Sequence, residues 1–275
     1  MKLDCHMHTP LCGHASGHPV EYVSKGSALG LDLMTFTCHI PMSDPDFGGP
    51  RIRMAHHQLE DYFRMVEQAR VAGEEHGIEI LCGIEAEVSA DSGALDEMIE
   101  LLNAHEFDFV LGSLHHQLKV YRDRLKRLGI NEDDQIIRDY FNTLTQAAAS
   151  GLYHSMSHPD VIRIYGTIDS ASFCPEAYEG EIRAFLQSCV RSDTCMEVNT
   201  SGLSKGVYTL HPDPIILKWA REEGVKLTLG SDAHAPESVG QHFDKVLTCL
   251  QEEGFTTLHY YRSGQQQTTA LTGFN

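Results

Sequence analysis

Short apolar runs alternate with amphipathic stretches along the whole chain. Strand-like apolar runs cover residues 2–5, 32–38, 79–85, 107–111, 153–157, 195–199, 226–229 and 256–261. Stretches with a helical period of apolar positions cover residues 20–29, 54–76, 94–103, 133–149, 176–190, 213–223 and 239–253. Seven or eight strand-then-helix units in a row predict a parallel barrel. Residues 43–53 and 117–132 fit neither pattern, and we expect two long loops over the barrel mouth.

Metal-ligating side chains recur where these apolar runs end. They are His6, His8, His39, Glu85, His115, His158, Asp232 and His234. The strand ends of a parallel barrel meet at one rim, and residues two apart in an extended segment point to the same side. Imidazole and carboxylate groups gathered in this way bind divalent ions. The pattern therefore predicts a site for several metal ions at the barrel mouth.

Other histidines leave alternatives open. The glycine-rich segment after the first strand holds His14 and His18, either of which is a candidate for a further ligand. His116 follows His115 directly and is expected to point away from it, while His211 is ambiguous because it lies in the loop after the sixth strand.

Composition narrows the class of protein. The 275 residues are expected to form a single domain over residues 1–275. The formal net charge of −18 argues against binding nucleic acid or an anionic membrane surface. A phosphorylated small molecule is compatible with this charge only if metal ions reverse its sign locally.

The cysteines and the lengths of the apolar runs bear on the cellular compartment of the protein. The eight cysteines contain no C-x-x-C pair, and Cys5, Cys38, Cys82 and Cys195 lie in strand-like runs and are expected to be buried. No apolar stretch reaches the roughly 18 residues of a membrane span, and the first residues do not look like a signal peptide. We expect a cytoplasmic protein with free thiols.

The strand-end residues resemble the polymerase and histidinol phosphatase (PHP) superfamily of metallophosphoesterases. Its motifs are matched by His6-x-His8, Thr37-Cys38-His39, Gly83-Ile84-Glu85, Ser113-Leu114-His115, His158-Pro159 and Ser231-Asp232-Ala233-His234. The segments 12–17 and 197–203 are similar to the histidinol-phosphatase branch. The resemblance implies an α/β fold, a distorted (β/α)7 TIM-like barrel, with a trinuclear metal site. The nitrogen-rich ligands with carboxylates suit two or three divalent ions of Zn, Mn or Fe.

The resemblance also divides the ligands among the ions. His6 and His8 would hold the first ion together with Glu85 and Asp232. Glu85 would bridge to a second ion, held also by His115 and His158. The third would be held by His14, His39 and His234, because His14 has the family's spacing from His8.

Two positions depart from the family pattern. Cys38 stands where an acidic residue usually precedes the histidine, and Ser204 and Lys205 stand where histidinol phosphatases carry an arginine. Lys205 and Arg163 are the candidates for contacts with a substrate phosphate.

The predicted function is the metal-dependent hydrolysis of a small phosphate monoester, with L-histidinol phosphate first among the substrates. A water activated between two ions would attack phosphorus, and Asp232 or His234 would protonate the leaving oxygen. One alternative is a phosphoesterase acting on a cyclic or nucleotide phosphate. Another, from a different class, is a non-catalytic metal-binding protein. The oligomeric state is left open.

Overall fold

The centre of the fold is a seven-stranded parallel sheet. The computed structural model describes residues 1–205 and 209–271. Its strands are β1 (Leu3–Met7), β2 (Leu33–Phe36), β3 (Glu79–Glu87), β4 (Phe109–Ser113), β5 (Ser155–Met156), β6 (Cys195–Asn199) and β7 (Leu227–Gly230). They pair in sequence order, each parallel to the next. A parallel bridge between Met7 and Ala233 joins the first strand to the segment after the last one. The sheet is thus a nearly closed barrel, as predicted.

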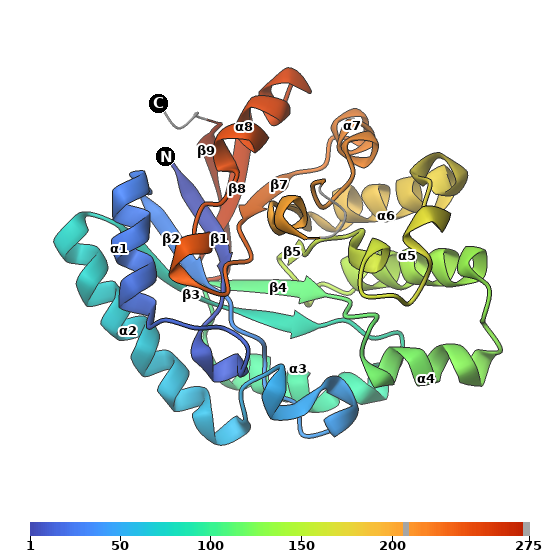
Figure 1. Ribbon diagram of the computed structural model, residues 1–275, viewed down its shortest axis with the longest axis horizontal. Coiled ribbons are helices and arrows are strands. Elements are labelled where there is room, and N and C mark those ends of the chain that lie inside the picture. Colours follow the sequence, from blue (N-terminus) through green and yellow to red (C-terminus); the bar gives the residue numbers. More distant parts are fainter. Residues whose placement is uncertain (206–208, 272–275) are drawn as a thin grey trace.

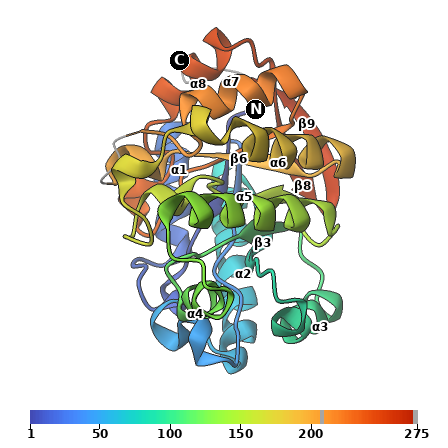
Figure 2. The same ribbon diagram turned by 90° about the vertical axis from the view of Figure 1, so that its right-hand side faces the viewer.

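Helices form a ring outside these strands (Figure 1). They are α1 (Pro19–Leu29), α2 (Leu59–His76), α3 (Asp96–Ala104), α4 (Lys119–Leu128), α5 (Asp133–Ala149), α6 (Glu179–Ser192), α7 (Pro214–Glu223) and α8 (Phe243–Glu252). Figure 2 shows α5 and α6 side by side across one face of the molecule. The alternation of strand and helix keeps every crossover in the same sense around the barrel, which brings the ends of all the strands to one rim.

The barrel interior is mostly apolar. Every residue of β1, β2, β4, β6 and β7 is buried. Two polar side chains inside it pair with each other, because Ser155 Oγ and Thr228 Oγ1 lie 2.8 Å apart. Cys5, Cys38, Cys82 and Cys195 are buried, as expected for small apolar side chains.

Three expectations about local structure need correction. Residues 117–132 are not a loop, because α4 occupies most of them. Its sequence is so rich in charge that only Tyr121 and Leu125, four residues apart, form a buried stripe. Helix α2 begins five residues later than predicted, because a short 3-10 turn, His56–Gln58, precedes it. The last predicted strand exists, but β8 (Thr257–Arg262) pairs with β9 (Gln265–Ala270) in a separate antiparallel hairpin.

The part of the chain that the structure describes contains no helix long and apolar enough to cross a membrane.

Candidate metal centre

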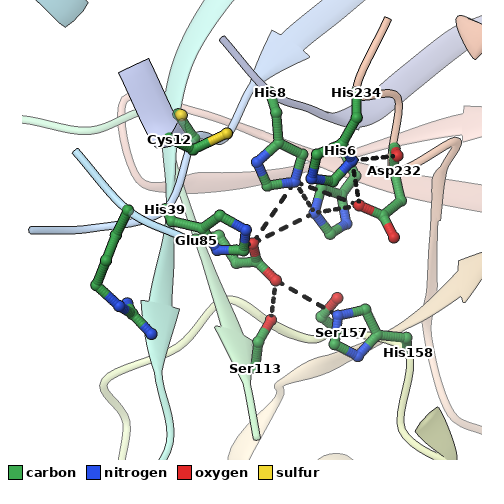
Figure 3. A network of polar contacts seen from close by, with 12 residues as sticks. His6, His8, Cys12, His39, Glu85, Ser113, Ser157, His158, Asp232 and His234 are labelled. Atoms are coloured by element: carbon green, nitrogen blue, oxygen red, sulfur yellow. Dashed lines mark hydrogen bonds and ion pairs between the residues drawn. The ribbon is translucent and has the colours of Figure 1, made fainter. Parts of the chain in front are cut away.

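The strand ends bring the predicted ligands together at one rim, as Figure 3 shows for seven of them. His6 lies within β1 and Glu85 within β3, while the others follow strands at the same end of the barrel. An isolated parallel bridge sets His39 directly beside Glu85. His158 and Asp232 have positive φ angles of 24° and 53°. Such angles are uncommon outside glycine and cluster at functional sites.

The first set of donor atoms surrounds one point. His6 Nε2 and His8 Nε2 are 3.1 Å apart. Glu85 Oε2 lies 3.7 Å from His6 Nε2 and 3.6 Å from His8 Nε2, and Asp232 Oδ1 lies 3.6 Å and 3.3 Å from the same two atoms. Donors about 2.0–2.2 Å from one ion are separated by such distances. The four side chains can therefore hold one ion.

The second set uses the other oxygen of the same glutamate. Glu85 Oε1 lies 3.5 Å from His115 Nε2 and 3.4 Å from His158 Nε2. Ser113 Oγ donates a hydrogen bond of 2.5 Å to this oxygen, which fixes the carboxylate in place. Glu85 is thus placed to bridge two ions.

The third set lies at the outer side of the cluster. His14 Nε2 and His234 Nε2 are 2.9 Å apart, and the rings of His14 and His39 stack with centroids 5.3 Å apart. Ring nitrogens of His8, His39 and His234 also lie within 4.8 Å of one another. The remaining nitrogens of His14 and His234 donate to the backbone oxygens of Cys12 and Asp232, both at 3.0 Å, which leaves both Nε2 atoms directed into the set.

The chemistry of this donor set fits divalent ions. Glu85 Oε2 and His39 Nδ1 are buried and lack hydrogen-bond partners among the described residues, although they lie only 2.6 Å apart. Buried polar atoms are rarely left unpaired in native proteins. Cations would satisfy both atoms and offset the cost of burying two carboxylates beside one another.

Two further carboxylates orient the ligand rings. Glu197 Oε1 accepts a hydrogen bond of 2.7 Å from His6 Nδ1, and Glu197 Oε2 accepts from Ser157 Oγ and the His158 N–H. Glu87 Oε2 accepts from His115 Nδ1 at 2.8 Å. Such partners fix the tautomer of a ligating imidazole and raise its basicity. Sequence analysis missed these roles, although the period of two places Glu87 on the same side of β3 as Glu85.

The electrostatics keep the ligand carboxylates anionic. Burial alone would raise their pKa values. The neighbouring His39 and His6 nevertheless hold the pKa of Glu85 well below its ordinary value. Lys205 and His6 do the same for the pKa of Asp232. Both carboxylates are therefore charged at neutral pH and able to bind cations.

Comparison with known proteins decides the family. The PHP domain family matches residues 4–201, which is more than half of the chain. The chain belongs to the PHP family. A relative in Deinococcus radiodurans, described as a probable histidinol-phosphatase, is 30% identical over 262 residues, covering 94% of this chain and 95% of that protein. A histidinol-phosphatase of Lactococcus lactis is 23% identical over 261 residues, 94% of this chain and 93% of that protein.

Among solved structures, the fold is similar to that of histidinol phosphate phosphatase from Lactococcus lactis, solved with zinc, L-histidinol and phosphate. The TM-score is 0.77 at 20% identity, over 97% of this chain and 98% of that one. The predicted family, its histidinol-phosphatase-like branch and the barrel fold are thus confirmed.

In this PHP chain the three sets open into a cavity of about 550 Å³. That volume suits a small molecule. Its walls beyond the ligand set include Ile52, Gln117, Val161, Tyr165, Ser201, Ser204, Lys205, Ser238 and Gln241. Lys205 Nζ lies 3.0 Å from Asp232 Oδ2, so the amine that was predicted to contact phosphate stands at the edge of the first donor set.

The structure places the other candidates elsewhere. Arg163 is buried outside the cavity lining and forms ion pairs with Asp160 at 2.8 Å and Asp213 at 3.3 Å, so its position argues against the predicted phosphate contact. His18 caps α1 by accepting the Val20 N–H. His211 is buried against Asp160, with Nδ1 and Oδ1 2.6 Å apart, which sequence alone did not reveal.

Proposed function

We propose that this protein is a metal-dependent phosphomonoesterase that acts on a small phosphorylated alcohol, with L-histidinol phosphate as the first candidate. The observation that carries this proposal is the convergence of three donor sets on one cavity of about 550 Å³. The names of the relatives matched over most of the chain support the choice of substrate. We further propose that residues 1–275 act as a single domain.

The protein side chains hold and orient the ions. In this proposal His6, His8, His14, His39, Glu85, His115, His158, Asp232 and His234 are the ligands, for two or three ions. Zinc, manganese and iron all suit nitrogen-rich sites with carboxylates. Divalent ions in such a centre lower the pKa of water and offset the charge that develops on the phosphoryl group.

Lys205 and Asp232 are placed to handle charge and protons. Burial alone would lower the pKa of Lys205, but the carboxylate of Asp232 raises it above the ordinary value, so the amine stays protonated. Asp232 Oδ1 faces the first donor set, while its Oδ2 accepts from Lys205 Nζ and Ser201 Oγ. We propose that Lys205 attracts the phosphate and that the Lys205–Asp232 pair delivers the proton to the leaving oxygen.

His234 fits the ligand role better than the role of an acid. Burial and the neighbouring His8 lower the pKa of His234 to about 4. Its ring is therefore neutral at pH 7, and both of its nitrogens are already engaged in the third set and in the bond to the Asp232 backbone.

Phosphate release tests the proposal. Protein loaded with zinc or manganese is incubated with L-histidinol phosphate, an aryl phosphate and a nucleoside monophosphate. It is also incubated with a cyclic nucleotide, with and without an added monoesterase that releases phosphate from the product of ring opening. We expect the fastest release from L-histidinol phosphate, and a loss of at least about 100-fold in His158→Ala, which removes a ligand, and in Asp232→Asn, which removes the negative charge of one. His76→Ala, in an exposed residue of α2, is the matched control.

Two results would reject parts of the proposal. Turnover of L-histidinol phosphate no faster than that of the aryl phosphate would reject the named substrate. Metal binding without release from any ester would reject the enzyme and favour a non-catalytic metal-binding protein.

A further inference from the structure

Two buried thiols lie against the third donor set. Cys12 ends the short turn Pro10–Cys12, between His8 and His14 in sequence, and Cys38 directly precedes His39. Both side chains are fully buried. Figure 3 shows the sulfur of Cys12 beside the ring of His8, on the outer side of the cluster. The backbone that places the third donor set therefore also places sulfur next to it.

The sulfur of Cys12 is within reach of several ring nitrogens. Cys12 Sγ and one ring nitrogen each of His14 and His234 lie within 4.8 Å of one another. Cys12 Sγ, Cys38 Sγ and a ring nitrogen of His8 form a second group whose atoms also lie within 4.8 Å of one another. Nitrogen and sulfur ligands of one tetrahedral zinc ion lie roughly 3.5 Å apart, so modest side-chain shifts would close the first group around an ion.

A buried imidazole nitrogen adds an independent observation. His8 Nε2 belongs to the first donor set, whereas His8 Nδ1 is buried without a hydrogen-bond partner among the described residues. In Figure 3 this second nitrogen lies on the side of the ring that faces Cys12. If Cys12 bound an ion as a thiolate, its sulfur could accept a hydrogen bond from the His8 Nδ1–H. A neutral thiol is only a weak acceptor.

Cys38 has partners of its own. Thr9 Oγ1 donates to Cys38 Sγ at 3.2 Å, and the Cys38 thiol faces the Thr9 backbone oxygen at 3.6 Å. This thiol is therefore held as a neutral neighbour of Cys12.

We infer that Cys12 is a sulfur ligand of the ion held by His14 and His234. The inference rests on the metal centre of the proposed function and adds a ligand to it. On binding, the sulfur lone pair forms the bond to the ion, and the thiol proton leaves to solvent. Thiolate is a soft ligand that favours zinc over manganese, so this outer position differs in metal preference from the two inner ones, which have only nitrogen and oxygen donors.

Cobalt binding tests this assignment without any measurement of activity. Full-length protein is stripped of metal with a chelator, kept reduced, and titrated with Co²⁺ under nitrogen. We expect a sulfur-to-cobalt charge-transfer band in the near ultraviolet. The band is lost in Cys12→Ser and retained in Cys38→Ala. In zinc titrations against a chromophoric chelator, Cys12→Ser lowers the affinity for one zinc ion by at least about 10-fold. This is the lower end of the range for loss of a residue that supports a metal site. Cys174→Ser, in an exposed cysteine far along the chain, is the control.

Each outcome decides the matter. Wild-type protein that binds cobalt in its visible d–d bands but shows no charge-transfer band overturns the role of Cys12 and leaves the metal centre standing, even if the variant does not fold. Wild-type protein that binds no cobalt or zinc overturns both. A charge-transfer band that survives Cys12→Ser also overturns the assignment.

Discussion

At the scale of single residues, the centre depends on side chains that would touch no ion. Glu197 receives hydrogen bonds from His6 Nδ1, Ser157 Oγ, the His158 N–H and Asn199 Nδ2. One carboxylate thus fixes one ligand that lies within β1 and another that follows β5. Removing its charge should loosen both ligands without removing either.

Glu197→Gln is therefore expected to weaken metal binding. The neutral amide cannot accept all four hydrogen bonds, and one of its ends becomes a donor. We expect a 10- to 100-fold loss of affinity, a typical range for such a partner. Competition with a chromophoric chelator measures it, and Glu60→Gln in the exposed first turn of α2 is the control. Unchanged affinity in Glu197→Gln would show that the hydrogen bonds to His6 and His158 are dispensable.

Arg53 and Glu87 form a buried ion pair behind His115. Arg53 Nη2 lies 2.5 Å from Glu87 Oε2, and both side chains are 1% exposed. The same guanidinium donates to the backbone oxygens of Phe47 and Ile40, so it ties the loop after β2 to the barrel.

Breaking this pair should be costly. Arg53→Met leaves Glu87 buried without its cation, and we expect the free energy of unfolding to fall by about 3 kcal/mol. The double variant with Glu87→Gln should lose clearly less than the sum of the two single losses, because the stranded charge is gone. Urea denaturation of the four proteins measures this cycle. Additive losses would mean that the two side chains act independently.

At the scale of elements, His154 is one of the residues that attach the β8–β9 hairpin to the barrel. The ring of His154 stacks on Tyr261 of β8, with centroids 4.4 Å apart and an interplanar angle of 8°. His154 Nδ1 accepts the N–H of Val110 in β4 at 2.9 Å, and the Tyr261 hydroxyl donates to the His154 backbone oxygen. The hydrogen bond from the Val110 N–H requires a neutral His154 ring, because Nδ1 is the acceptor.

The attachment of the hairpin should therefore depend on pH. Burial lowers the pKa of His154 to about 4. The unfolded chain, with a histidine pKa of about 6.5, binds the proton more readily. The contribution to stability is complete above about pH 6.5, falls as the pH drops towards 4, and amounts to about 3 kcal/mol between the two limits.

His154→Asn isolates this effect, because the amide oxygen can accept the Val110 N–H but does not titrate. Thermal unfolding from pH 7 to 4.5 should show a shallower loss in the variant than in the parent protein. Carboxylates that titrate in the same range affect both proteins alike. Parallel curves would exclude His154 as the source of the pH dependence.

Strand ends could be predicted from the sequence, but long-range partners could not. His6 and His8 stand two apart after an apolar run, so their shared side follows from the extended backbone alone. Arg163 was a candidate for a contact with phosphate, and its burial depends on Asp160 and on Asp213, which is 50 residues away. Helix α4 was missed because its charged surface hides a stripe of only two buried side chains.

At the scale of the whole molecule, folding and metal binding should be linked. The inner donors are 0–8% exposed and bring two carboxylates into a space lined by imidazoles. Ligands that bind only the native state stabilise it according to their concentration relative to Kd. The barrel without ions must tolerate this crowding of charge.

Metal removal is therefore expected to lower the melting temperature. Zinc at 100 times its Kd adds about 2.7 kcal/mol, which corresponds to roughly 5–10 °C for a chain of this size. Calorimetry with zinc and with a chelator measures the shift. The variant Asp232→Asn, in which one ligand has lost its negative charge, should show a smaller difference between the two conditions. Equal melting temperatures for the parent protein in both would contradict the linkage.

The division between the donors and the cavity wall has an evolutionary consequence. Ile52, Gln117, Tyr165 and Ser238 line the cavity without belonging to any donor set, and they come from four separate connections between strands and helices. Replacements at these four positions would change which alcohol fits the cavity and would leave the three donor sets intact. Descendants of one ancestral barrel could in this way exchange one phosphorylated metabolite for another in a few steps, and directed evolution of this chain would begin at those four positions.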